Sequence, residues 1–144
     1  MPQPSQADIL KPGDPFPIET IRLSERAKQQ LINLKRNTGI ENWNVLCRWA
    51  FCISMSEPSK PPAEGQNSSS SIEMHWKTFA GHEEDAYRAI LLSRLNQDFG
   101  IFTAAQVSTQ FRLHLHRGIS RLAGRRIRSV AELVELAVST PLSK

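Results

Sequence analysis

The chain has 144 residues, of which 40% are hydrophobic and 22% are charged. This length suits one domain with a real hydrophobic core, and the apolar content excludes global disorder. No apolar stretch approaches the roughly 20 residues that a membrane-spanning helix needs. The first residues also lack the basic-then-apolar order of a signal peptide. We therefore expect a single cytoplasmic domain over residues 1–144, with no membrane partner.

Positive charge is concentrated in two parts of the sequence. Residues 22–56 hold six Lys or Arg against two acidic residues, and residues 110–144 hold seven against two. Residues 57–109, between them, hold four against seven. A folded chain with this distribution presents a positive face, which is typical of proteins that meet phosphate. Charge alone leaves a solvated, salt-bridged surface as an equal alternative.

The first third of the chain predicts an arm, a strand and two helices. Residues 1–17 contain five prolines and no hydrophobic period, which indicates a flexible arm. Residues 18–24 partly alternate between apolar and polar side chains and predict a short strand. Ser24 is a good cap for a helix over residues 25–38. A second helix begins near Asn42 and is apolar on nearly all sides, which indicates burial on several faces.

The remainder predicts a loop, an extended segment and helices. Residues 57–71 are rich in Pro and Ser and indicate a mobile loop. Residues 72–79 alternate well enough for an extended segment. Helices follow over residues 83–97 and from Thr103, where the spacing is that of a capping box. A second capping box at residues 129–132 opens a short last helix.

The expected fold is mainly α, with a strand-helix-helix unit at residues 18–56 and a helical part at 72–144. A strand followed by two helices is the order of a ribbon-helix-helix protein, in which two chains pair their strands into a ribbon that enters the DNA major groove. A lone strand leaves its backbone groups unpaired, so it needs a partner. That partner is either the strand of a second chain or residues 72–79 of the same chain, and the sequence leaves both open.

No motif of the sequence indicates catalysis, a metal or a cofactor. His114 and His116 point about 200° apart on a helix, so they suit polar flanks of that helix rather than a metal site. Glu83, Glu84 and Asp85 cluster where a helix N-terminus favours acidic residues. We expect no catalytic residue and no cofactor, with metal-dependent nicking of DNA kept open as the weaker alternative.

The apolar second helix indicates a subunit interface. The residues that we expect there are Trp43, Trp49, Phe51 and Cys52. Cys47 and Cys52 lie about 140° apart around the helix, so they do not bridge locally. Free, buried thiols are expected for both.

The cations expected to contact phosphate come from both basic segments. They are Arg22, Arg26, Lys28, Lys35, Arg36, Arg117, Arg121, Arg125, Arg126 and Arg128. The last three follow a predicted helix, so capping of its final carbonyls is an alternative role for them.

Five blocks of the sequence resemble, in order, the DNA sulfur modification protein DndE family. They are Ile21–Leu31, Leu34–Cys52, Glu57–Ser59, Trp76–Phe79 and Phe111–Ile119. The resemblance covers roughly residues 18–123 and implies a role in phosphorothioation, the replacement of a non-bridging phosphate oxygen by sulfur. Family members are small subunits with a fold related to ribbon-helix-helix proteins.

The resemblance also implies partners and a division of labour. The partners would be double-stranded DNA, intact or nicked, together with a sulfurtransferase, a cysteine desulfurase, an ATPase and further copies of the chain, a tetramer being attractive. We therefore expect a DNA-binding accessory subunit that holds the backbone while partners transfer sulfur. Three alternatives stay open: a nicking enzyme of the same pathway, a ribbon-helix-helix transcriptional repressor, and a subunit whose basic face meets an acidic protein.

Overall fold

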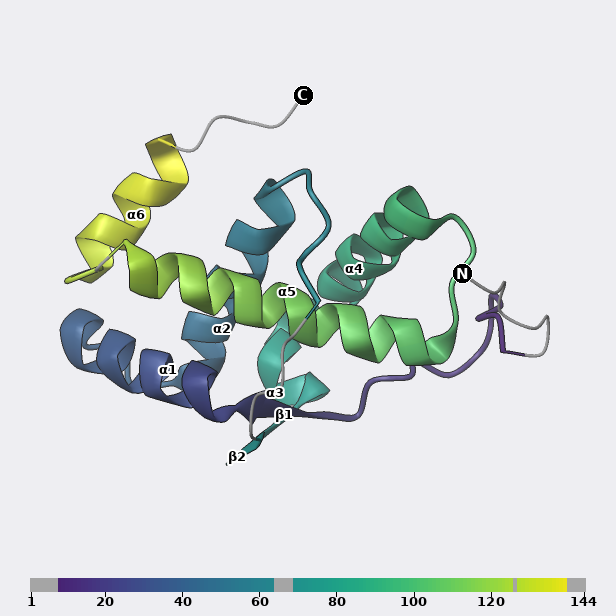
Figure 1. Ribbon diagram of the computed structural model, residues 1–144, viewed down its shortest axis with the longest axis horizontal. Helices are drawn as coiled ribbons and strands as arrows, with labels where there is room; N and C mark the ends of the chain where they lie inside the picture. The colour runs from purple at the N-terminus through teal and green to yellow at the C-terminus, as the bar shows by residue number, and fades with distance from the viewer. Residues whose placement is uncertain (1–7, 64–68, 126, 140–144) are drawn as a thin grey trace.

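The computed structural model describes residues 8–63, 69–125 and 127–139. In chain order its elements are β1 (Thr20–Ser24), α1 (Glu25–Thr38), α2 (Trp43–Ser56), β2 (Ser69–His75), α3 (Trp76–Ala80), η1 (Gly81–Glu83), α4 (Glu84–Phe99), α5 (Ala104–Gly124) and α6 (Val130–Ser139). The chain is mainly helical with one short strand pair, as the sequence predicted (Figure 1). Within these three stretches no helix has both the length and the apolar character to cross a membrane.

The strand β1 finds its partner inside the same chain. It pairs antiparallel with β2, with Ile21 opposite Met74 and Arg22 opposite Glu73. Of the two partners that the sequence left open for this strand, the structure therefore selects the intrachain one. Pairing satisfies backbone groups that an isolated strand would leave without hydrogen bonds.

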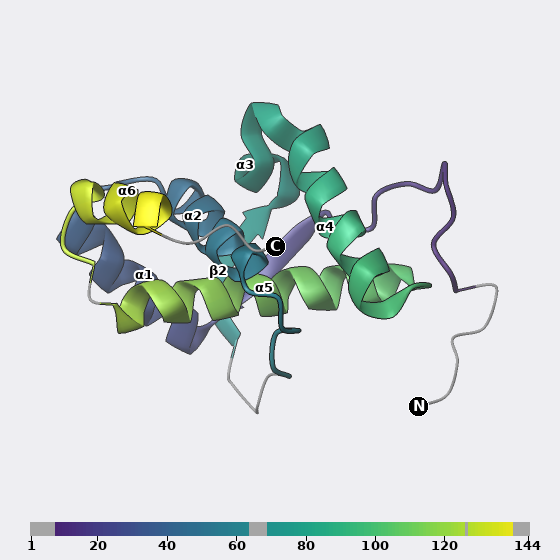
Figure 2. The ribbon, with the colours of Figure 1, turned by 90° about the horizontal axis from the view of Figure 1, so that it is seen from above.

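Helix α5 is the central element, and α2 crosses it at very short range (Figure 2). The crossing depends on Gly118, because a Cβ atom there would lie 1.8 Å from the carbonyl oxygen of Ala50. Any other residue at 118 would push the two backbones apart. The close approach brings the C-terminal end of α2 against the middle of α5.

Aromatic rings fill the space among α2, α3, α4 and α5. The ring of Phe51 packs edge-on against Phe79, Tyr87 and Phe111, at centroid distances of 5.5, 5.9 and 5.6 Å. Phe51 is 0% exposed. The prediction that Phe51 serves a subunit interface is therefore wrong. Helix α2 is apolar on many sides because three other helices of the same chain cover it.

The predicted extended segment at residues 72–79 is divided between a strand and a helix. The strand β2 starts earlier, at Ser69, inside the predicted loop, and ends at His75. Trp76, Phe79 and Ala80 are then buried at helical spacing in α3. The chain turns into a helix because these three side chains reach the core together only with a period near 3.6.

Residues 8–17 are held against the core, although the sequence predicted a flexible arm. The backbone N–H of Leu10 donates to the carbonyl of Phe102 at 3.0 Å. The Phe16 ring packs on Trp76 at 4.7 Å, and Arg88 lies over the same ring. Scattered apolar side chains anchor this segment without forming any period. Residues 1–7 of the predicted arm lie outside the described residues.

Candidate nucleic-acid interface

The predicted phosphate-contacting cations do not share one surface. Arg22 lies on the sheet, where its guanidinium donates to the Glu73 carboxylate at 2.8 Å. On α1, Lys28 and Lys35 are each about 180° around the helix from Arg26. Lys35 and Arg36 occupy the last turn of α1, and both are exposed. Arg126 lies outside the described residues.

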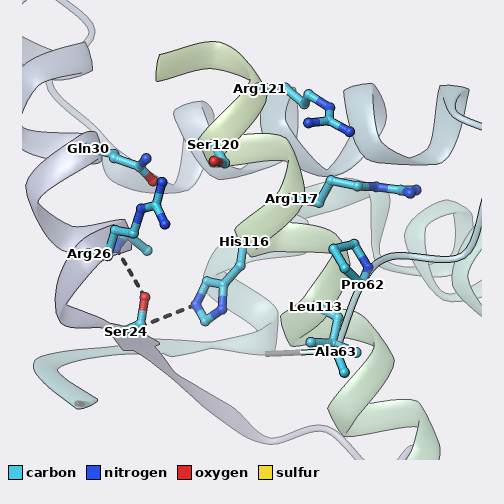
Figure 3. Close-up of a pocket in the computed structure, with 11 residues that line it drawn as sticks. Ser24, Arg26, Gln30, Pro62, Ala63, Leu113, His116, Arg117, Ser120 and Arg121 are labelled. Carbon is cyan, nitrogen blue, oxygen red and sulfur yellow. Dashed lines mark hydrogen bonds between the residues drawn. The ribbon is translucent and has the colours of Figure 1, made fainter. Parts of the chain in front are cut away.

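Helices α1 and α5 lie side by side and end at the same end of the molecule (Figure 1). Two adjacent hollows follow the line between them, and we call these together the α1–α5 groove. The first hollow, of about 240 Å³, is lined by Ser24, Arg26, Ala27, Gln30, Pro62, Ala63, Leu113, His116, Arg117, Ser120 and Arg121 (Figure 3). The second, of about 460 Å³, is lined by Gln30, Asn33, Leu34, Asn37, Ala123, Ile127 and Arg128.

The lining of the groove suits an anion. None of the described residues that line either hollow is acidic. In the first hollow, Arg26 and Gln30 face inward from α1, and His116 and Ser120 rise from α5 between the walls (Figure 3). Arg121 stands on the opposite side. Guanidinium, amide and hydroxyl groups are the donors that nucleic-acid-binding proteins direct at phosphate oxygens.

The two ends of the groove are joined by a polar row on α1. Arg26, Gln30, Asn33 and Asn37 follow one another at intervals of four, three and four residues, which places them on one helix face. The sequence analysis identified Arg26 and missed the three amides. This spacing was the available signal, but a polar helix face is usually a solvated one.

A buried arginine cluster lies next to the first hollow, at the C-terminal end of α2. Arg94 donates to the carbonyls of Met55, Glu57 and Ser59, at 3.2, 2.7 and 2.6 Å. Its Nε also bonds to the Asp98 carboxylate at 3.0 Å. These contacts satisfy carbonyls that the end of a helix leaves without intrahelical donors.

Arg117 belongs to this cluster. Its Nε donates to Ser54 Oγ, and its terminal nitrogens donate to the carbonyls of Ser54 and Ser59, at 2.8 and 2.9 Å. The residue is 6% exposed. The prediction that Arg117 contacts DNA phosphate is therefore wrong, because the turn after α2 already takes up its hydrogen-bond donors.

His114 is buried in the same cluster, although the sequence predicted a polar flank. Ser54 Oγ accepts from Arg117, so its hydroxyl proton is available to donate to His114 Nδ1, 2.8 Å away. Burial, with help from the charges of Arg117 and Arg94, lowers the pKa of His114 to about 3. The imidazole is therefore neutral at physiological pH, which is the form that accepts this hydrogen bond.

Arg121 connects the cluster to the groove. Its side chain is 51% exposed and forms a two-point contact with the Glu57 carboxylate, with both N–O distances at 3.0 Å. The hydrogen bond from Arg121 is the main reason that the pKa of Glu57 lies below its usual range. Of the predicted cations on α5, Arg121 is thus both held in place and open to solvent.

Cys52 and Trp49 of the predicted interface lie elsewhere on α2, which also carries Cys47. Cys47 is buried, and burial raises the pKa of its thiol to about 12. Cys52 is exposed, which corrects the prediction of a buried thiol, and its pKa is also raised, mainly by partial burial. Cys52 lines a separate surface hollow together with Val45, Arg48, Trp49 and Tyr87. Across the part of the chain that the structure describes, no group of three or more His, Cys, Asp or Glu is placed to hold a metal ion.

Comparison with known proteins relates the chain to one family of proteins. A family model described as DNA sulphur modification protein DndE matches residues 20–129. A similar solved structure is that of DndE from Escherichia coli B7A, involved in DNA phosphorothioation modification. The two chains share 22% identity and superpose with a TM-score of 0.59, over 72% of this chain and 94% of the other. At this identity the likeness shows the fold. No curated protein matches the chain.

Proposed function

The chain belongs to the DndE family of DNA sulphur modification proteins, and from that premise we propose that it is a DNA-binding accessory subunit of DNA phosphorothioation. In this role it holds the DNA backbone, at a nick or in intact duplex, while partner subunits transfer sulfur. The observation that carries the proposal is the α1–α5 groove, whose described lining is rich in hydrogen-bond donors and includes no acidic residue.

The dimensions of the groove suit a stretch of backbone. From Arg26 to Asn37 the helix rises on the order of 16 Å, at 1.5 Å per residue. That length accommodates several phosphates of one strand. Arg26 supplies positive charge at one end of the groove, near the Arg121–Glu57 ion pair, and Arg128 supplies it at the other. Contacts of this kind fix a protein on DNA without reading its sequence.

The cysteines support assigning the sulfur chemistry to partner subunits. A thiol attacks or carries sulfur as the thiolate. The pKa of Cys47 is raised to about 12 and that of Cys52 is raised as well. Neither is therefore activated at neutral pH in this chain.

Binding to a random-sequence duplex across a salt series tests the proposal. We expect affinity to fall steeply with salt, and Arg26→Gln to reduce the slope of log K against log salt by about one and to weaken binding to all sequences alike. Lys28→Gln is the matched control, because Lys28 lies on the opposite side of the same helix. Equal effects of the two substitutions would exclude the groove as the binding surface.

The same titration with intact, nicked and single-stranded DNA, with and without magnesium, separates the remaining roles. Tighter binding to the nicked duplex would place the protein at the modification step. Cleavage of intact DNA would overturn the accessory role in favour of a nicking enzyme. Tight binding confined to one palindrome would indicate a repressor, and failure to bind any DNA at low salt would assign the basic surface to a protein partner.

A further inference from the structure

The first hollow of the α1–α5 groove has two chemically different walls. One wall, on α1, offers hydrogen-bond donors from Arg26 and Gln30. The facing wall is apolar and is formed by Pro62, Ala63 and Leu113. In Figure 3, Pro62 and Leu113 lie across the hollow from Arg26. A plain phosphate uses only the first wall.

Leu113 is the buried member of the apolar wall. It is 7% exposed and counts among the buried hydrophobic residues of the chain, although it stands outside their main contacting cluster. Its side chain lies beside Pro62 and Ala63 at the edge of the hollow.

The volume of the hollow limits what enters it. About 240 Å³ is below the range of roughly 300–1,000 Å³ typical of pockets that enclose a small organic ligand. That volume is enough for a single backbone linkage, with its two non-bridging atoms.

We propose that this hollow recognises the phosphorothioate linkage, with the non-bridging sulfur against Leu113 and Pro62 and the non-bridging oxygen facing Arg26 and Gln30. The inference rests on the proposed function, since it assumes that DNA lies in the groove. It goes further, because it gives the protein a preference for the product of sulfur transfer over the unmodified backbone.

The difference between non-bridging sulfur and oxygen predicts that the phosphorothioate linkage binds more tightly than the phosphate. Sulfur is larger than oxygen and a weaker hydrogen-bond acceptor, so it loses little on leaving water for an apolar wall. An oxygen in the same place loses its hydrogen bonds to water without replacement. The remaining oxygen keeps its charge-assisted contact with Arg26 in either case. Since the two walls are fixed, only one of the two phosphorothioate stereoisomers presents its atoms in the required order.

Fluorescence anisotropy with three short duplexes of one sequence tests the inference. The duplexes carry a plain phosphate, or a single phosphorothioate of either configuration, at the same central position. We expect one stereoisomer to bind about fourfold more tightly than the phosphate duplex, as burial of one methylene-sized apolar group predicts. The other stereoisomer should bind no more tightly than the phosphate.

Two variants assign the effect to the hollow. Pro62→Ser changes an exposed residue of the apolar wall, and Leu113→Asn changes its buried member, with a thermal melt to confirm folding. Both should abolish the preference for sulfur, so that the affinities for the phosphorothioate and phosphate duplexes become equal. Pro12→Ser, at another exposed proline, is the matched control and should keep the preference.

The outcomes separate this inference from the proposed function. Equal affinity for all three duplexes would overturn the phosphorothioate site and leave the DNA-binding role intact. A sulfur preference that survives in Pro62→Ser would likewise overturn it, because the sulfur would then contact another surface. Failure to bind any of the duplexes at low salt would overturn both proposals together.

Discussion

Ser54 and Gly118 are the two residues that position the buried arginine cluster. Gly118 lets α2 and α5 touch backbone to backbone, and Ser54 then bonds to both His114 and Arg117 across the contact. The Glu57–Ser59 turn accepts hydrogen bonds from Arg94, Arg117 and Arg121. A turn that the sequence assigned to a mobile loop is thus held by three guanidinium groups.

Substitution of Gly118 by Ala should destabilise the protein strongly. A Cβ atom would lie 1.8 Å from Ala50 O, so the helices must separate, at a cost of about 3 kcal/mol. Gly124→Ala is the control, because nothing lies within 4 Å of a Cβ atom there, and it should be neutral or slightly stabilising. Urea unfolding of the two variants measures the difference, and equal stabilities would contradict the close crossing.

The buried His114 predicts a dependence of stability on pH. Its folded-state pKa is lowered to about 3 from the usual value of 6.5 for histidine, so the unfolded chain binds a proton that the folded chain does not. The contribution of His114 is therefore complete above about pH 6.5 and decreases as the pH falls toward 3. Glu57, whose pKa is lowered from 4.5, also loses its contribution on acidification, but only at lower pH.

Denaturant unfolding between pH 5 and 7 isolates the histidine. We expect the free energy of unfolding to decrease from pH 7 to pH 5 in the parent protein. His114→Asn keeps an acceptor for the Ser54 hydroxyl and does not titrate, so its stability should change less over the same interval. Identical pH profiles for the two proteins would show that His114 does not carry this dependence.

At the scale of the element, side-chain caps fix the residues at which α1 and α5 begin. Ser24 Oγ accepts from the Ala27 N–H at 3.1 Å, as predicted for the start of α1. At the start of α5 the capping box is complete, since Thr103 Oγ1 accepts from Gln106 N and Gln106 Oε1 accepts from Thr103 N. Half of the predicted box at Ser129 forms, since Ser129 Oγ accepts from the N–H of Glu132 at 3.3 Å. The Glu132 carboxylate accepts from the N–H of Arg128 instead of from that of Ser129.

Removal of the α5 cap should have a small, measurable cost. Thr103→Ala deletes the hydroxyl acceptor and leaves the Gln106 N–H without it, which costs about 1 kcal/mol of stability. Thr109→Ala, at an exposed position in the interior of the same helix, should be neutral or slightly stabilising, because Ala has the higher helix propensity. Thermal unfolding of both variants provides the test, and a loss in Thr109→Ala as large as that in Thr103→Ala would contradict the capping role.

At the scale of the whole molecule, the chain presents two chemically different surfaces. The α1–α5 groove is lined by donors and cations. The hollow formed by Val45, Arg48, Trp49, Cys52 and Tyr87 is mostly apolar. Trp43 and Trp49 are half-buried and Cys52 is exposed, so these three residues of the predicted subunit interface are still available to a second copy.

Self-association through this apolar surface is the prediction at this scale. Light scattering at micromolar concentration should give a mass that is a multiple of 16.2 kDa. Trp49→Glu should return the mass to that of one chain, because the added charge is costly to bury. Val138→Glu, at a residue that is 81% exposed on α6, should leave the assembly unchanged. A parent protein that is already monomeric would contradict the prediction.

The sequence by itself determined the features that depend on near neighbours. The starts of α1 and α5 follow from capping residues within three positions, and the helices themselves follow from the spacing of apolar side chains. It also placed the chain in its family, through blocks whose residues are close together in sequence. The mainly helical fold with a short N-terminal strand was predicted for the same reason.

Only the tertiary structure decided which distant segments meet. It paired β1 with β2 instead of with a second chain, and it buried His114, Arg117 and Phe51, which the sequence had assigned to surfaces. It also formed the α1–α5 groove from Arg26 and Gln30 on one side and Ser120 and Arg121, some 90 residues further along the chain, on the other. The physical reason is that burial and groove lining depend on how helices cross, and the crossing of α2 and α5 is fixed by one glycine against one backbone carbonyl.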